Sequence, residues 1–185
     1  LRAADRWLTF AKSGGLRPFK TPMVVPDILA VVQQQTGAAV YVPPGQSLRI
    51  TARGPPDIAL SAAPATGRHA TRVIAPESMR RSVRGQGSNT RHVCDILPET
   101  EAAESLLVVE VITPAGNSSS YPPHKHDSAD PAAPDAETVL EETYFHLLNP
   151  SQGFAFQRVY TDDRSIDEAM AVEHRDTVMV PRGYH

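Results

Sequence analysis

Proline and glycine interrupt this sequence at short intervals along its whole length. The 185 residues include 17 prolines and 11 glycines. Because proline removes a backbone donor and glycine favours turns, long uninterrupted helices or strands are excluded over most of the chain. The apolar segments between them are short, and the most apolar one, at 106–112, is rich in β-branched residues. The sequence therefore predicts an all-β fold of many short strands joined by turns, as in a barrel or sandwich.

Length, charge and cysteine content narrow the class of protein. A chain of this length forms one ordinary domain or two small ones. The formal net charge is -3 and the charges are interspersed, which favours neither nucleic acid nor a membrane as a partner. The single cysteine, Cys94, excludes an internal disulfide and is expected to fill the core rather than act as a nucleophile. No apolar run has the length of a membrane span, and residues 1–15 are a poor match to a signal peptide, so the expected location is the cytoplasm.

Local patterns predict where the elements lie. Two short apolar faces, at 5–15 and 26–37, predict helices to which no function is assigned. The basic, glycine-rich stretch 80–91 is interpreted as a connection between two units. Two of the predicted strands are expected to form a hairpin around 149–153, and the last segment is expected to form a strand pair of its own. The segments that predict strands are 47–52, 57–65, 105–116, 139–148, 153–161 and 169–185.

A pair of histidines one residue apart is the first sign of a functional site. His124 and His126 follow two prolines in a polar stretch, and in an extended backbone their rings would lie on one face, close enough to share one ion. Such a pair also occurs by chance in polar loops. The predicted strand at 139–148 adds Glu142 on one face and Glu141 on the other, and a Pro-x-Gly turn then delivers His185. Three nitrogens and one oxygen in this order suit zinc, manganese, iron, nickel or cobalt.

A short sequence motif occurs twice in the chain, which suggests a duplication. Residues 41–47 and 179–185 share the pattern apolar-Val-Pro-x-Gly-x-x, with Ser47 in the first copy where His185 stands in the second. Two distant copies of one turn suggest two copies of one barrel. Because Ser47 replaces the histidine, we expect the first copy to be structural.

These motifs together resemble a known family. The His-x-His pair, the downstream glutamate and the Pro-x-Gly turn leading to histidine resemble the two motifs of the cupin β-barrel. Within the cupins, "SSYPPHKHD", "LEETYFH", "GFAFQRVYTDDRSIDEAMAV" and "VPRGYH" are similar to the 5-deoxy-glucuronate isomerases of inositol catabolism, which are related to the 5-keto-4-deoxyuronate isomerases. The resemblance covers roughly residues 38–185.

The resemblance implies a double barrel, or bicupin, with both barrels incomplete in this chain. Residues 1–37 are left unassigned, and 38–100 would form the remainder of an N-terminal barrel and a connection. Residues 101–185 would form a C-terminal, metal-binding barrel without its closing strands. The implied activity is metal-dependent isomerisation of 5-deoxy-glucuronate to 5-dehydro-2-deoxy-gluconate, with a small-molecule sugar acid as partner and a homo-oligomeric assembly. The alternatives are a non-catalytic or truncated cupin that binds sugar acids, and an iron-dependent cupin dioxygenase.

The resemblance also implies roles for individual residues. The ligands of a divalent metal, zinc or manganese with iron, nickel and cobalt as alternatives, would be His124, His126, Glu142 and His185, with Glu141 the competing carboxylate. Catalysis moves a proton between C1 and C2 of the open-chain sugar, and arginine or lysine should hold its carboxylate. For Arg158 a structural salt bridge is an equal alternative, and His146 is expected to be a hydrogen-bonded histidine rather than a ligand. The catalytic candidates are Tyr144, Arg158 and Tyr160, and the substrate-binding candidates are Lys125, Arg182 and Tyr184.

Overall fold

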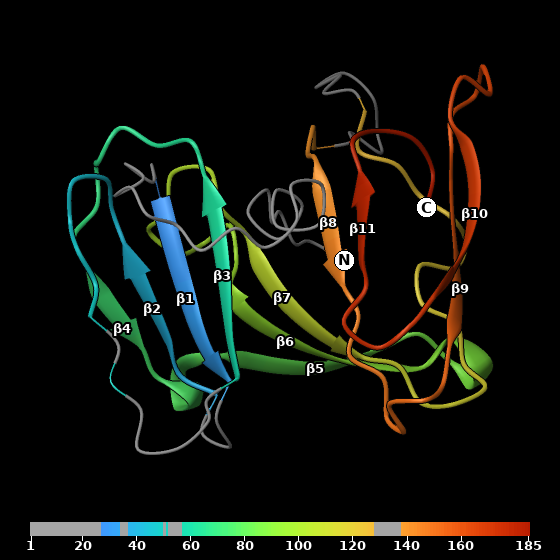
Figure 1. The fold of residues 1–185 in the computed structure, drawn as a ribbon, viewed down its shortest axis with the longest axis horizontal. Helices are drawn as coiled ribbons and strands as arrows, with labels where there is room; N and C mark the ends of the chain where they lie inside the picture. The colour runs from blue at the N-terminus through green and yellow to red at the C-terminus, as the bar shows by residue number, and fades with distance from the viewer. Residues whose placement is uncertain (1–26, 34–36, 50, 52–56, 128–137) are drawn as a thin grey trace.

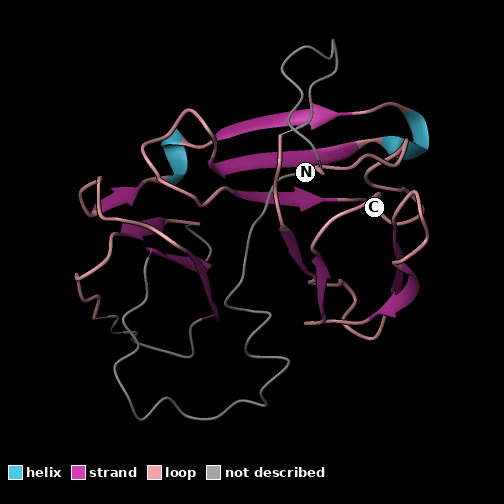
Figure 2. Cartoon of the chain, turned by 90° about the horizontal axis from the view of Figure 1, so that it is seen from above, coloured by secondary structure: helices cyan, strands magenta, loops and turns pink. Residues whose placement is uncertain are grey.

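The structure is a computed structural model that describes residues 27–33, 37–49, 51, 57–127 and 138–185. These residues form eleven β-strands and two short 3-10 turns, Pro76–Ser78 and Gly87–Asn89, with no α-helix among them (Figure 2). The all-β prediction is therefore confirmed. The strands are β1 (Asp27–Gln33), β2 (Ala39–Val42), β3 (Asp57–Ala63), β4 (Arg72–Ile74), β5 (Arg80–Arg84), β6 (Arg91–Leu97), β7 (Val108–Ile112), β8 (Glu142–Phe145), β9 (Ala155–Tyr160), β10 (Asp167–Val172) and β11 (Thr177–Val180).

The strands form four separate antiparallel sheets in the described part of the chain, and none of the sheets is closed. In Figure 1 the sheet of β1 to β4 lies on the left, β8 to β11 lie on the right, and β5 to β7 run beneath both. The middle sheet pairs β6 with β7 across the predicted boundary between 100 and 101. The middle sheet thus contains strands from both sides of that boundary, and the division into units stays a prediction.

The first sheet corrects one prediction from the sequence. Its strand order is β3-β1-β2-β4, and β1 pairs with β3 along all seven of its residues. The helix predicted at 26–37 is wrong, because a short apolar run rich in Ile and Val is compatible with either element until a pairing partner is known. The helix predicted at 5–15 lies outside the described residues. Of the strand predicted at 47–52, the described residues 47–49 and 51 form no strand.

The middle sheet corrects a second prediction. Residues 80–91 do not form a plain connection: β5 and β6 make a hairpin around the 3-10 turn Gly87–Asn89. Arg80 and Arg84 both contact Asp95 of β6, each at 3.4 Å. The arginines of 80–84 therefore belong to a strand, and two of them pair with a carboxylate of the neighbouring strand.

The C-terminal strands pair in a nested order. β9 pairs with β10, while β8 pairs with β11 around them. The predicted hairpin of β8 and β9 is therefore wrong, and so is the predicted pairing of the last two strands with each other. Val159, Val172, Val178 and Val180 from three of these strands form one buried cluster. The strands themselves were predicted correctly, but their partners are decided by which apolar faces meet.

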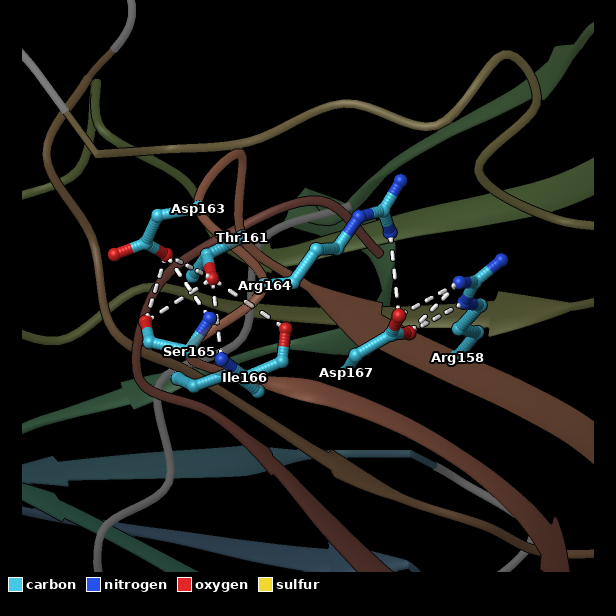
Figure 3. Close-up of polar contacts among 7 residues, drawn as sticks. All are labelled: Arg158, Thr161, Asp163, Arg164, Ser165, Ile166 and Asp167. Carbon is cyan, nitrogen blue, oxygen red and sulfur yellow. Dashed lines mark hydrogen bonds and ion pairs between the residues drawn. The ribbon is translucent and has the colours of Figure 1, made fainter.

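The connection between β9 and β10 is a compact polar turn, as its composition predicted (Figure 3). One carboxylate oxygen of Asp163 accepts hydrogen bonds from the Thr161 hydroxyl at 2.6 Å and from the Ser165 backbone N–H at 3.1 Å. These bonds lower the pKa of Asp163, the Thr161 bond most strongly. The turn is thus stabilised locally, by its own side chains.

A second buried cluster lies under the first and middle sheets. It includes Tyr41, Leu97 and Leu106, which are almost completely buried, together with Cys94. The sulfur of Cys94 lies 3.9 Å from that of Met79, and burial raises the pKa of the thiol. Cys94 is therefore a core residue, which confirms the prediction.

Within the described residues, no helix is long and apolar enough to cross a membrane.

The stability of the first half should depend on Glu104 in a pH-dependent way. The carboxylate of Glu104 accepts hydrogen bonds from the Thr66 hydroxyl at 2.9 Å and from the backbone N–H groups of Thr66 and Arg68. Together these bonds lower the pKa of Glu104 from 4.5 to about 2, and the bond from Arg68 contributes most. A carboxyl whose pKa is lower in the folded than in the unfolded chain stabilises the fold at any pH above its unfolded-state pKa. This contribution is lost as the pH falls through the folded-state pKa.

We therefore expect Glu104→Gln to lower the midpoint of urea unfolding at pH 7, with the difference from the parent chain shrinking between pH 4.5 and about pH 2. Glu77→Gln, a change at an exposed position, is the control and should have little effect. A difference that stays constant with pH would contradict the role of the Glu104 charge.

Candidate metal centre

The four predicted ligands come from three separate segments that tertiary contacts bring together. His124 and His126 lie in 121–127, which forms no regular strand. Glu142 is the first residue of β8, and its pairing with Val180 places the turn after β11 next to it. His185 follows that turn, and its backbone N–H donates to the carbonyl of His124 at 3.1 Å. The pairing of β8 with β11 thus brings together ligand residues that are far apart in the sequence.

The side chains converge as well. One ring nitrogen from each of His124, His126 and His185 lies within 4.8 Å of the other two. The Nε2 atom of His126 is 3.2 Å from one carboxylate oxygen of Glu142, and Nε2 of His185 is 3.5 Å from the other. Glu142 is 2 % exposed, whereas Glu141 is exposed. Between the two competing carboxylates, the fold therefore brings Glu142 to the histidines.

The electrostatic state of the cluster suits a cation. Burial, reinforced at His124 by the neighbouring His185, lowers the pKa of both of these histidines to about 4. Both imidazoles are therefore neutral near pH 7, and a neutral imidazole offers a lone pair to a metal. Among the described residues, the buried Nε2 atom of His185 has no hydrogen-bond partner. Nitrogen lone pairs and a buried carboxylate gathered in one place are a donor set that fits a divalent ion.

A neighbouring backbone carbonyl holds one of these ligands, His126, in place. Nδ1 of His126 lies 3.1 Å from the carbonyl of Thr138, and because a carbonyl only accepts, this nitrogen carries the proton. In a neutral imidazole this leaves the lone pair on Nε2 of His126, the atom that faces Glu142, as expected for a ligand oriented by a second hydrogen bond. Sequence analysis missed Thr138, since a backbone carbonyl leaves no signal in residue type.

Tyr144 is the one catalytic candidate that contacts the cluster in the described structure. Its hydroxyl donates a 2.6 Å hydrogen bond to a carboxylate oxygen of Glu142, and its ring lies 5.6 Å from that of His185. Burial, helped by the Glu142 charge, raises the pKa of Tyr144 well above its ordinary value. The phenol is therefore protonated at neutral pH and acts as a hydrogen-bond donor.

The other tyrosine candidates lie in a stack beside the cluster. The rings of Tyr160 and Tyr184 are 5.2 Å apart and nearly parallel, and the two residues also form a backbone bridge. Nζ of Lys125 lies 4.9 Å from the centre of the Tyr184 ring and 2.6 Å from the Asp162 carboxylate. The Asp162 hydrogen bond raises the pKa of Lys125, so this side chain is a persistent cation.

The two arginine candidates are found in polar contacts around the β9–β10 turn. Arg158 makes a bidentate pair with Asp167, with bonds of 2.9 and 2.7 Å from its Nε and Nη2, and it lies 4.7 Å from the Tyr160 ring (Figure 3). Arg182 donates to the Ser165 hydroxyl at 3.0 Å. The structural ion pair weighed for Arg158 is thus present, and no described contact joins either arginine to the histidines. Their catalytic and substrate-binding roles stay predictions.

His146 behaves as expected. Its Nε2 lies 2.9 Å from the side-chain oxygen of Gln157, and the residue is half-buried. His146 thus follows the end of β8 and contacts β9 through a hydrogen bond. It is not part of the three-histidine group.

The fold and the site define an all-β protein with a candidate centre for a divalent metal, built from three histidines and one glutamate. Residues 30–185 match the model of the KduI/IolB family, and the chain belongs to this family. The membership confirms the resemblance seen in the sequence.

Individual relatives agree with this assignment. A 5-deoxy-glucuronate isomerase of Geobacillus kaustophilus is 51% identical over 147 residues, covering 80% of this chain and 52% of that protein. One of Bacillus subtilis is 48% identical over 157 residues, covering 84% and 57%. A solved structure of an IolB-like protein from Salmonella typhimurium LT2 superimposes with a TM-score of 0.77 at 44% identity, covering 88% of this chain and 66% of that one. The chain spans about half the length of the curated relatives it matches.

The cluster should bind one divalent ion per chain. We expect elemental analysis of chain purified with zinc or manganese to give about one ion per molecule, as for a single site of this donor set. His126→Ala should weaken binding by more than the roughly 10- to 100-fold that loss of an outer-shell partner costs. The control is His92→Ala, at an exposed histidine of β6. Equal metal content in both variants would contradict the site.

The turn that delivers His185 should not tolerate a side chain at Gly183. This residue has φ +92°, and an added Cβ would lie 2.5 Å from the Tyr160 carbonyl oxygen. Gly45, in the matching turn of the first half, has φ +76°, but no atom of the described residues lies within 4 Å of an added Cβ. Both Gly→Ala changes cost backbone strain, but only Gly183→Ala should also displace His185 and lower metal affinity. The measurement is zinc titration of both variants, and an equal loss of affinity would contradict the argument.

Proposed function

We propose that this chain carries the metal centre and substrate site of an isomerase that converts 5-deoxy-glucuronate to 5-dehydro-2-deoxy-gluconate in myo-inositol catabolism. The observation that carries the proposal is the convergence of the half-buried His124 and His126 with the buried His185 and Glu142 in a member of the KduI/IolB family. Relatives about half identical to this chain are named 5-deoxy-glucuronate isomerase. The substrate is a small-molecule sugar acid.

The four ligands would hold zinc or manganese, with iron, nickel and cobalt as alternatives. The ion would polarise the sugar carbonyl, which makes the neighbouring C–H more acidic. Tyr144 keeps its proton and donates to Glu142, so it orients this carboxylate and offers a hydroxyl beside the reacting carbons. Proton transfer between C1 and C2 also needs a base within hydrogen-bond reach of the substrate, and the protonated Tyr144 would serve only as the donor in this transfer.

The cations around the tyrosine stack are proposed to bind the carboxylate of the sugar acid. Lys125 stands between two ligand histidines in the sequence and packs on Tyr184, next to His185. Its present partner, Asp162, is exposed and belongs to the turn after β9. A substrate carboxylate would replace this surface partner, at little cost in stability. Arg182 and Tyr184 complete the proposed substrate group, and Arg158 and Tyr160 support it from β9.

The architecture is proposed to be a bicupin whose first half is structural. In both halves a strand ending in valine, Val42 of β2 or Val180 of β11, leads into proline and then a glycine with positive φ. This supports a duplicated unit, in which Ser47 takes the position of His185. Assembly into a homo-oligomer and a cytoplasmic location belong to the same proposal.

The function is tested by following the sugar acid directly. Zinc- or manganese-loaded chain is incubated with 5-deoxy-glucuronate under nitrogen, and NMR records the aldose and ketose signals. We expect conversion by the parent chain, none by Glu142→Gln, and unchanged conversion by the matched control Glu141→Gln, because only Glu142 is buried beside the histidines.

Each other outcome points to a different function. Binding of the sugar acid without conversion by the parent chain would indicate a non-catalytic binding protein. A reaction that requires oxygen would indicate a cupin dioxygenase.

A further inference from the structure

Three successive backbone N–H groups hold the segment that ends in His185. The N–H of Gly183 donates to the carboxylate of Asp127 at 2.6 Å. The N–H of Tyr184 donates to the Tyr160 carbonyl at 2.7 Å, and that of His185 to the His124 carbonyl at 3.1 Å. This segment follows the end of β11, so these three hydrogen bonds hold its backbone in place of a strand-pairing ladder.

The Asp127 contact differs from the other two in kind. Two of the three acceptors are backbone carbonyls, which every residue type supplies, whereas the third is a side-chain carboxylate. The position of Gly183 therefore depends on the identity of residue 127.

Asp127 also links the two segments that carry the histidines, 124–127 and 183–185. It follows His126 directly, so one short segment carries two imidazoles, the carbonyl that binds His185 and the carboxylate that binds Gly183. The bond spans 56 positions in sequence. The 124–127 segment and the 183–185 segment are thus tied at two points, on either side of Tyr184.

The backbone of a glycine depends more than that of other residues on contacts that fix its conformation. Gly183 has φ +92°, and the Tyr160 carbonyl leaves no room for a Cβ at this position. The same lack of a side chain gives glycine the largest conformational freedom, so its direction must be fixed from outside. A small rotation at Gly183 would move the imidazole two residues later.

We propose that Asp127 is a positioning residue of the metal centre: its carboxylate fixes the backbone at Gly183 so that the imidazole of His185 faces those of His124 and His126. The inference rests on the proposed metal-dependent function and deepens it. Asp127 touches neither metal nor substrate in this role, and it acts through His185.

The test is titration of the chain with Co²⁺ alone, followed by its visible absorption, with Asp127→Ala, Asp127→Asn and His185→Ala. Loss of an outer-shell partner typically weakens metal binding about 10- to 100-fold, and we expect a loss in this range for Asp127→Ala. Asp127→Asn keeps an oxygen that accepts from Gly183 and should bind close to the parent chain. Asp127→Ala should also shift the cobalt spectrum towards that of His185→Ala.

A double variant separates positioning from general stability. If Asp127 acts through His185, the Asp127→Ala change should have no further effect on cobalt affinity in the His185→Ala background. Asp163→Ala is the matched control, since Asp163 also accepts from a backbone N–H, in the β9–β10 turn (Figure 3). It should leave cobalt affinity unchanged.

The outcomes that overturn the inference are distinct from those that overturn the function. Parent-like binding by Asp127→Ala, additive losses in the double variant, or equal weakening by Asp127→Asn would each reject Asp127 as a positioning residue while the centre stands. Parent-like binding by His185→Ala would reject the metal centre itself, and the role of Asp127 with it.

Discussion

The antiparallel pairing of β8 with β11 determines where the candidate metal centre forms. Val180, the last residue of β11, is opposite Glu142, the first residue of β8. The chain therefore leaves β11 beside the Glu142 carboxylate, and the Pro-x-Gly turn carries His185 back to it. A slip of one residue would exchange the faces of β8, turning Glu142 and Tyr144 outward. The valine cluster of β9, β10 and β11 opposes such a slip, because it would expose Val178 and Val180.

Bringing these ligands together carries an electrostatic cost that the surroundings reduce. A buried carboxylate is unfavourable unless it is hydrogen-bonded or paired. Tyr144 donates to Glu142, and the low pKa values of His124 and His185 keep their imidazoles neutral, which avoids two buried positive charges. The same burial that lowers these pKa values frees the nitrogen lone pairs for a cation. Desolvation of these side chains thus makes the group suitable for a metal.

The strands were easier to predict than their partners. β3, β7, β8 and β9 lie where alternation or β-branched composition predicted them. β1 was mistaken for a helix, and the pairings of β8 to β11 were wrong, since short connections suggested sequential hairpins where the structure nests one pair inside another. Periodicity reports which side of an element is buried, but it contains no information about which other element covers that side.

The sequence by itself determined the all-β class, the family and the four residues that converge as candidate ligands, because residue type and order along the chain are local properties. The tertiary structure decided between Glu142 and Glu141, since burial depends on strand register. It also revealed that Arg158 is paired with Asp167, that Thr138 orients His126 and that Asp127 holds Gly183. These contacts join segments from different strands and turns, and only the packing of the sheets brings such segments within hydrogen-bond distance.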